Sequence, residues 1–259
     1  MKFISLISGS SGNATLISDG GTNILVDCGM SGKKLSESLA AIDMHADELD
    51  ALLITHEHID HVRGAGVIAR RYNIPVYATE GTFASMETGA IPEWNVISPD
   101  ADFEIGSIGV MPFSIPHDAS QPVGYSFFSD DRKYTIATDI GHMSGYVLNH
   151  LTGSDTILLE SNHDIDMLRM GTYPFPLKQR ILSSTGHLSN DDAAEALCRL
   201  AQSGTEHFML GHLSKENNTP QIAYMSAQNA LSEAGINVGD DITLTVAQRN
   251  AVTLCEAFV

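Results

Sequence analysis

Cysteine, positive charge and long hydrophobic runs are all scarce in this sequence. Its three cysteines, Cys28, Cys198 and Cys255, are far apart and form no C-x-x-C pair, so the sequence indicates neither a disulfide framework nor a thiolate zinc site. No stretch approaches the ~18 apolar residues of a membrane span, and the N-terminus lacks the ~7 to 15 apolar residues of a signal peptide. We therefore expect a cytoplasmic protein with no membrane association.

The scarcity of positive charge limits the partners of the protein. Lysine and arginine together number 14 and aspartate and glutamate 32, which gives a formal net charge of -18. On average, a surface of that charge repels nucleic acids and anionic membranes. A nucleic-acid substrate would therefore have to be held by a local group of basic side chains. We expect no obligate protein partner.

The remaining composition is that of an ordinary globular protein. Hydrophobic residues make up 43% of the 259 residues, and the length suits one domain over residues 1–259. Hydrophobic periodicity and turn residues predict strands at 3–7, 14–18, 23–26, 51–54, 94–98, 107–115, 123–128, 134–137, 156–159, 207–210, 241–246 and 252–256, and helices at 31–41, 61–72, 191–202 and 221–233. Strand-rich sheets with helices outside them explain this mixture better than a doubly wound sheet. The predicted fold class is therefore α/β, an αββα four-layer sandwich.

The segment 55–61, Thr-His-Glu-His-Ile-Asp-His, is the densest cluster of metal-ligating residues. A shuffled chain of this composition would contain H-x-H-x-D-H roughly once in a thousand trials, so a chance run of solvated polar residues is a poor explanation. Imidazole and carboxylate groups suit Zn²⁺ and similar ions, and a turn from strand to helix can aim alternate side chains at two adjacent centres. The cluster predicts a divalent metal site.

This segment, with Ile-Leu-Val-Asp-Cys-Gly upstream at 24–29, resembles the signature of the metallo-β-lactamase superfamily, and the match extends over nearly the whole chain. The resemblance implies the four-layer sandwich of that superfamily and a centre for two divalent ions. Zinc is the expected metal, with manganese or iron as alternatives. By similarity, the ligands would be His56, His58 and His117 for one ion, Asp60, His61 and His212 for the other, and Asp139 bridging them.

Five further blocks resemble one branch of the superfamily, the YycJ/WalJ-like exonucleases. They are Ser-Gly-Ser-Ser-Gly-Asn at 8–13, Glu-Ser-Asn-His-Asp at 160–164, Tyr-Pro-Phe-Pro-Leu-Lys-Gln-Arg at 173–180, Gly-His-Leu-Ser-Asn at 186–190 and His-Leu-Ser-Lys-Glu-Asn-Asn at 212–218. The layout is also similar to ribonuclease Z and to the PhnP phosphodiesterases. The resemblance implies a phosphodiester hydrolase, most specifically one that acts on DNA ends.

Two residues are expected to take part in the chemistry directly. Paired divalent ions lower the pKa of a bridging water towards 7 and neutralise phosphate oxygens, which would give a hydroxide nucleophile. Asp60 would orient that hydroxide while binding its metal. His187 is the expected general acid for the leaving alkoxide, because an imidazole titrates near neutral pH.

A further group of residues is expected to contact the substrate. The segment 9–12, Gly-Ser-Ser-Gly, could cradle a phosphate with backbone N–H groups or simply form a tight turn beside the site. His163 could support the site or contact substrate. The expected substrate-binding residues are Ser10, Asn13, His163, Lys178, Arg180 and Lys215, and binding of DNA would also bring Lys33, Lys34 and Arg63 towards the cleft.

Several functions remain open at this point. The leading interpretation is a two-metal phosphodiesterase or nuclease. The alternative is a hydrolase of a small ester, thioester or cyclic phosphate, for which the acidic surface would not matter. A β-lactamase is disfavoured by the missing signal peptide, and a serine hydrolase by the missing G-x-S-x-G motif. A metal-bound binding module without activity is disfavoured by a complete ligand set with an acid beside it.

Overall fold

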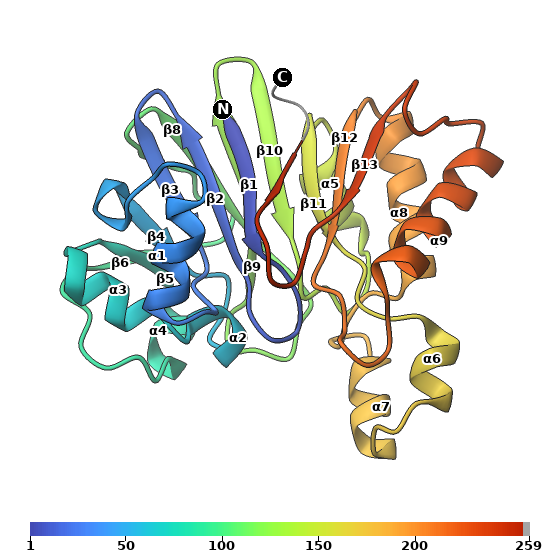
Figure 1. Ribbon diagram of the computed structural model, residues 1–259, viewed down its shortest axis with the longest axis horizontal. Coiled ribbons are helices and arrows are strands. Elements are labelled where there is room, and N and C mark those ends of the chain that lie inside the picture. The colour runs from blue at the N-terminus through green and yellow to red at the C-terminus, as the bar shows by residue number, and fades with distance from the viewer. Residues whose placement is uncertain (256–259) are drawn as a thin grey trace.

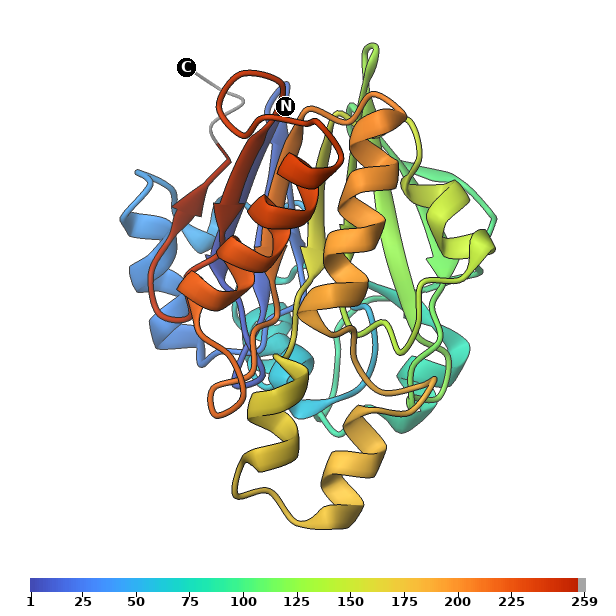
Figure 2. The same cartoon turned by 90° about the vertical axis from the view of Figure 1, so that its right-hand side faces the viewer.

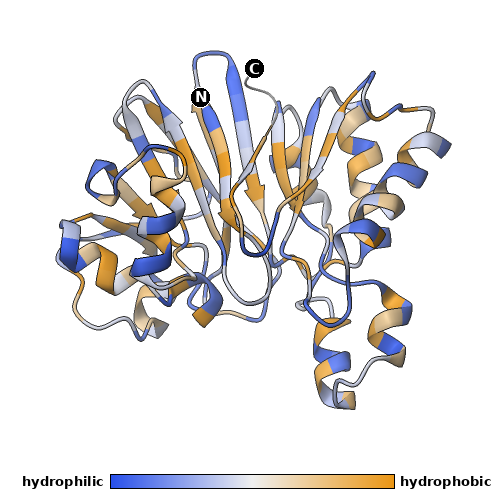
Figure 3. Cartoon of the chain, in the orientation of Figure 1, coloured by the Kyte–Doolittle hydropathy of each residue, from blue (hydrophilic) through white to orange (hydrophobic). Residues whose placement is uncertain are grey.

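The computed structural model describes residues 1–255. Within them the chain forms two seven-stranded sheets that pack face to face, with helices on the outer face of each sheet (Figure 1). This confirms the predicted αββα four-layer sandwich. Side chains of both sheets meet in a buried cluster that includes Phe3, Leu53, Tyr125 and Met209. Figure 3 shows apolar residues concentrated along the strands, whereas the outer helices carry both apolar and hydrophilic residues, as expected for helices with one buried face.

The two sheets are built in the same way, as an antiparallel meander continued by parallel strands. In the first sheet the meander is β1 (Lys2–Ile7), β2 (Ala14–Asp19) and β3 (Thr22–Val26), the parallel strands are β4 (Ala51–Leu53), β5 (Val76–Thr79) and β6 (Trp94–Ile97), and β14 (Thr253–Leu254) pairs with β1. In the second the meander is β7 (Phe103–Ile105), β8 (Ile108–Ser114), β9 (Val123–Ser129) and β10 (Arg132–Ala137), continued by β11 (Thr156–Glu160), β12 (His207–Gly211) and β13 (Thr243–Val246). Parallel strands end at the same edge of a sheet, so the loops that follow β3 and β4 lie together, as do those that follow β10, β11 and β12.

Most of the helices lie against these sheets. They are α1 (Gly32–Ala40), α3 (Ala65–Tyr72) and α4 (Glu80–Ser85) on the first sheet, and α5 (Gly145–Leu151), α8 (Asn190–Gln202) and α9 (Pro220–Glu233) on the second (Figure 2). A side-chain hydroxyl caps five of them, because Ser31, Thr79, Ser144, Ser189 and Thr219 each accept a hydrogen bond from the N–H three residues later. A 3₁₀ turn, Ala46–Glu48, precedes β4. None of the helices in residues 1–255 is long and apolar enough to cross a membrane.

Two short helices, α6 (Ile165–Met170) and α7 (Phe175–Ile181), project from the sandwich (Figure 1 and Figure 2). We call residues 165–181 the projection. The Asp164 carboxylate caps α6 by accepting from the Met167 N–H. The two helices are tied together by Lys178, whose ammonium donates to the carbonyls of Arg169 and Gly171 at 2.7 Å each.

The predicted helix over 61–72 is wrong, because two helices occupy this region. They are α2 (Ile59–Val62) and α3, separated at Arg63 and Gly64. A Cβ atom on Gly64 would lie 2.2 Å from the carbonyl oxygen of Met30. The chain therefore bends at a glycine that packs directly against neighbouring backbone, and α2 stays a single turn beside the loop that carries His56 and His58.

The other differences concern short elements and element ends. The sequence prediction omitted β5, β7 and the helices α4 to α7, none of which is longer than seven residues. Helices of about two turns or fewer, and strands of three or four residues, are too short to show a recognisable hydrophobic periodicity. The strand predicted at 241–246 begins at Thr243. That predicted at 252–256 is observed as Thr253–Leu254, and position 256 lies outside the described residues.

Candidate metal centre

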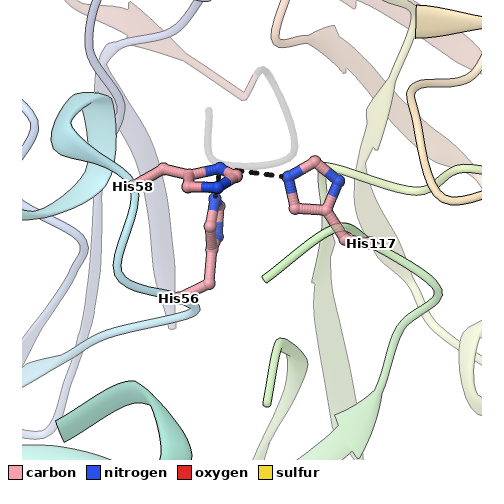
Figure 4. A group of neighbouring side chains, drawn as sticks. All are labelled: His56, His58 and His117. Atoms are coloured by element: carbon pink, nitrogen blue, oxygen red, sulfur yellow. Dashed lines mark hydrogen bonds between the residues drawn. The ribbon is translucent and has the colours of Figure 1, made fainter. Parts of the chain in front are cut away.

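The first group of ligand candidates consists of three imidazoles from two loops. His56 and His58 follow β4, and His117 follows β8. His56 Nε2 lies 3.1 Å from His58 Nδ1, and His117 Nε2 lies 3.2 Å from the same atom (Figure 4). His56 and His117 are buried. Three ring nitrogens therefore converge on one small volume.

The second group combines Asp60, His61 and His212, from the turn after β4 and the end of β12. His212 Nε2 lies 3.4 Å from Asp60 Oδ2, and His61 Nε2 lies 3.6 Å from the same oxygen. Asp139 lies between the two groups. Its carboxylate is 3.3 Å from His61 Nε2, 3.5 Å from His212 Nε2 and 3.8 Å from His117 Nε2. All seven predicted ligand residues are thus brought together at one edge of the sandwich.

Hydrogen bonds determine which ring nitrogen three of these imidazoles present. Each Nδ1 lies beside an oxygen that can only accept: the Gly186 carbonyl for His117 at 3.1 Å, Asp27 Oδ2 for His61 at 2.7 Å and Glu160 Oε1 for His212 at 2.8 Å. Each Nδ1 therefore carries a proton and donates it, so that the lone pair of Nε2 points towards the centre whenever the ring is neutral. This is the arrangement in which imidazole binds a metal ion.

Buried carboxylates and imidazoles shift one another's pKa values at the centre. Burial disfavours the ionised form of Asp139, but the His212 and His61 rings hold the pKa of this carboxyl well below its usual range. Its Oδ2 atom is nevertheless buried and lacks a hydrogen-bond partner. Burial also lowers the pKa of His212, and nearby carboxylates, chiefly Asp139, outweigh it and raise that pKa to about 10. The centre thus demands positive charge, which protons or a metal cation can supply.

These observations fit divalent cations. Within residues 1–255, four overlapping sets of three or four side chains have ligand atoms within 4.8 Å of one another, including His56, His58 and His117 as one set and Asp60, His61 and His212 as another. The donors are imidazole nitrogens and carboxylate oxygens, which suit zinc and related ions. A cation would also give the orphaned Asp139 oxygen a partner.

The backbone is strained where several of these residues stand. Asp27, Asp139 and His212 have positive φ angles of 60°, 59° and 56°. The left-handed region costs an ordinary residue about 1–3 kcal/mol, although aspartate and histidine adopt it more readily than most. Local bonds hold the strained turns, since the His212 N–H donates to Ser8 Oγ at 2.8 Å and the Asp27 N–H to the Leu53 carbonyl at 2.8 Å. The fold therefore stabilises these left-handed conformations, in which the side chains point towards the metal centre.

Glu160 is the main site residue that the sequence analysis did not assign. It ends β11, is fully buried, and its Oε1 accepts from Nδ1 of both His187 and His212 at 2.8 Å. Its Oε2 accepts from the N–H groups of Ile140 and Leu188. Burial opposes ionisation, but the His187 and His212 rings outweigh it and lower the pKa of Glu160 to about 2. The sequence feature that could have identified Glu160 is its position as an acidic residue at the end of a largely apolar strand.

Asp27 has a matching role on the other side of the centre. It is buried, and its carboxylate accepts from His61 Nδ1 at 2.7 Å and from the N–H and hydroxyl of Thr55 at 2.9 Å each. Asp27 and Glu160 therefore fix the orientation of His61 and His212 in the same way. Mutation of a carboxylate that accepts a hydrogen bond from a ligating imidazole commonly lowers metal affinity 10- to 100-fold.

A cavity of about 410 Å³ opens beside the centre. His187 lies on its wall, with Nδ1 held by Glu160, and its ring is 5.2 Å from the rings of His117 and His212. The projection contributes Tyr173, Leu177 and Arg180 to the same wall. The Arg180 guanidinium donates two hydrogen bonds to Asp118, which also lines the cavity.

The predicted substrate residues are distributed unevenly around this cavity. Ser10 and Arg180 line it, but Asn13, His163, Lys178 and Lys215 do not. Asn13 is buried, with Nδ2 3.1 Å from His61 Nε2, so it supports the centre. The Lys178 ammonium is held by carbonyls of the projection, and Lys215 extends into solvent.

His163 and the glycine-serine segment also have defined places. His163 is buried, and neither of its ring nitrogens has a hydrogen-bond partner. Of the two interpretations of segment 9–12, the structure has the tight turn, closed by a 2.9 Å bond from the Gly12 N–H to the Gly9 carbonyl.

Gly29 provides a test of how closely the loops around the centre pack. A Cβ atom at this position would lie 1.7 Å from the carbonyl oxygen of Asp60. Gly29→Ala is therefore expected to destabilise the fold by about 2 kcal/mol or more, because backbone must move to relieve the overlap. Gly145→Ala is the matched control, since nothing lies within 4 Å of the added atom. Urea unfolding should show a lower midpoint for Gly29→Ala alone, and equal midpoints for both variants would contradict the packing described.

Comparison with known proteins gives four informative matches. The family model described as Beta-lactamase superfamily domain matches residues 22–213. Exodeoxyribonuclease WalJ of Streptococcus pneumoniae is 43% identical over 246 residues, covering 93% of this chain and 91% of that protein. Exodeoxyribonuclease YycJ of Bacillus anthracis is 40% identical over 244 residues, covering 93% and 92%. Among solved structures, the metallo-beta-lactamase fold protein YhfI of Bacillus subtilis superposes with a TM-score of 0.70 at 15% identity, covering 98% and 100%.

Proposed function

The chain belongs to the beta-lactamase superfamily, and on that premise we propose that it is a metal-dependent nuclease that hydrolyses DNA from its ends. Two curated relatives that cover nearly the whole chain are exodeoxyribonucleases. The observation that carries the proposal is the convergence of seven ligand candidates, Asp139 among them, beside a cavity with an arginine in its wall. The family model and the two relatives confirm the family that the sequence motifs predicted.

The metal ligands are proposed as two sets that share one carboxylate. His56, His58 and His117 form the first set, Asp60, His61 and His212 form the second, and Asp139 lies between them. Zinc suits this donor set best, and manganese or iron is the alternative. When bound, such ions lower the pKa of water and neutralise charge on phosphate oxygens.

The protein's own side chains supply proton handling. Asp60 lies on the cavity wall, where its carboxylate is placed to orient an attacking water. His187 donates from Nδ1 to Glu160, which leaves Nε2 as the atom that can protonate a leaving alkoxide. Arg180 lines the same wall and is the cationic side chain of that cavity that can pair with a phosphate.

The projection favours a nucleic acid over a small ester as substrate. Tyr173 lines the cavity, while Met170 and Phe175 on the same projection are 81% and 71% exposed. Aromatic side chains beside a phosphate-binding groove stack on nucleic-acid bases and contribute about 1–3 kcal/mol per base. The second candidate, hydrolysis of a small ester, thioester or cyclic phosphate, is favoured by the net charge of -18 and by a cavity of about 410 Å³.

A substrate panel separates the two candidates. Protein loaded with Zn²⁺ or Mn²⁺ is assayed on end-labelled linear DNA, closed circular DNA, RNA, bis(p-nitrophenyl) phosphate and a thioester. The proposal expects shortening of linear DNA, resistance of circular DNA, and loss of activity with a chelator or in Asp139→Asn prepared in parallel. Turnover of small esters with intact DNA and RNA would replace the nuclease by the second candidate.

A further inference from the structure

A second cavity, of about 200 Å³, is lined by basic side chains. Lys34, Arg63 and Arg249 reach it from α1, from the residue after α2 and from the segment between β13 and β14. Ser11 and Ser31 add hydroxyl groups, and its lining includes no acidic side chain. The whole chain has 14 basic and 32 acidic residues, so a cavity lined by three cations and no carboxylate is not expected from the composition. We call it the basic pocket.

Within residues 1–255, none of the three cations of the basic pocket forms an ion pair, and Glu216, which acts electrostatically on Arg249, is not part of the pocket lining. The Lys34 ammonium donates to Asn250 Oδ1 at 3.1 Å, and the Arg63 guanidinium to the Ser11 carbonyl at 3.4 Å. Arg249 Nη2 donates to the Leu213 carbonyl at 3.0 Å, while its buried Nη1 has no acceptor. Like charges held together repel, and a buried guanidinium donor without an acceptor is costly. An anion in the pocket would relieve both.

The basic pocket lies next to the metal centre. Ser10 lines the cavity of the metal centre and Ser11, the next residue, lines the basic pocket. The β1–β2 loop therefore separates the two cavities. The segment after β13 reaches the same place because it returns from the second sheet to pair with β1 (Figure 1). An extended polyanion lying across this loop can reach both cavities at once.

We propose that Lys34, Arg63 and Arg249 form a subsite for a backbone phosphate of the nucleic-acid strand, next to the phosphodiester that is cleaved. This inference rests on the proposed function. Arginine and lysine supply charge-assisted hydrogen bonds to phosphate oxygens, and α1, which begins at Ser31 on the pocket wall, adds the positive end of its dipole. The subsite would let a chain of net charge -18 hold DNA locally.

A double variant and a matched control test the subsite. Lys34→Gln with Arg63→Gln removes two charges from the pocket. Lys2→Gln with Arg71→Gln removes two from exposed positions outside it. The substrates are a 12-nucleotide single-stranded DNA and bis(p-nitrophenyl) phosphate, which has one phosphodiester and cannot span both cavities. Binding of a fluorescein-labelled DNA of the same length is followed by anisotropy, and thermal melting checks that both variants fold.

The pocket variant is expected to raise KM and Kd for the DNA about 10- to 100-fold. It should change kcat on DNA and the turnover of bis(p-nitrophenyl) phosphate by no more than about twofold relative to wild type. The slope of log Kd against log salt concentration should become shallower by the amount expected for the loss of about one phosphate contact. The control should stay near wild type. Equal losses in both variants would mean a long-range field effect and overturn the subsite. The subsite would also be overturned if neither variant lost DNA binding, or if the pocket variant lost only the binding of inorganic phosphate.

Failure of the proposed function gives a different pattern. If the wild-type protein binds the DNA without cleaving it and only the pocket variant loses binding, the subsite stands and the nuclease proposal falls. If the wild-type protein does not bind the DNA at all, both proposals fall.

Discussion

Replacing Asp139 with asparagine is expected to lower turnover of every substrate by more than about 10³-fold. Asp139 is buried and reaches His61, His117 and His212 with its carboxylate, so it is shared by both proposed metal sets. The amide keeps the shape and tolerates the left-handed backbone at φ 59°, but it removes the negative charge. Loss of a shared anionic ligand weakens binding of both ions, and about 4 kcal/mol in the barrier corresponds to a factor of ~10³.

Metal content measured after gel filtration, beside turnover of bis(p-nitrophenyl) phosphate, checks this result. Asp164→Asn is the matched control, because Asp164 caps α6 and asparagine caps a helix equally well. The control should retain metal and activity. An Asp139→Asn protein that kept a full complement of metal would show that Asp139 is not shared by the two sets.

The proximity of the ligand candidates could be predicted from the sequence because these residues occur in short motifs directly after strands. His56, His58 and His61 belong to one seven-residue segment, and parallel strands place the ends of β10 and β12 at a common edge. Backbone topology alone therefore brings Asp139 and His212 near that segment. The four-layer fold was predictable for a similar reason, since its long strands and long helices show clear periodicity.

Contacts between distant side chains were not predictable. Glu160 holds His187 and His212, which are 27 and 52 residues away in the chain, and no local pattern relates them. Lys178 was expected to contact substrate because of the block it belongs to, yet its ammonium ties α7 to the end of α6. Membership of a motif gives position along the chain but not the direction of a long, flexible side chain. That direction depends on which acceptors the fold brings near.

The second large effect on turnover is expected for a substitution of His187, which shares its hydrogen-bond acceptor Glu160 with the ligand candidate His212. His187→Ala should leave both ions bound and lower kcat by about 10²- to 10⁴-fold on DNA, whose alkoxide leaving group needs a proton. Turnover of a p-nitrophenyl ester should fall far less, because that leaving group needs little protonation. Nδ1 of His187 is held by Glu160 and its ring lies on the cavity wall, so the ring is oriented for proton transfer from Nε2.

The competing interpretation of His187 is ligation, since Asp139, Glu160, His187 and His212 also have ligand atoms within 4.8 Å of one another. Metal content separates the two roles. Glu160→Gln is the informative companion variant, because it disturbs His187 and His212 together: it should weaken metal binding about 10- to 100-fold and also lower turnover on DNA. If His187→Ala loses metal to the same extent as Glu160→Gln, or slows DNA and the p-nitrophenyl ester equally, His187 is a ligand or positions phosphate and is not the acid.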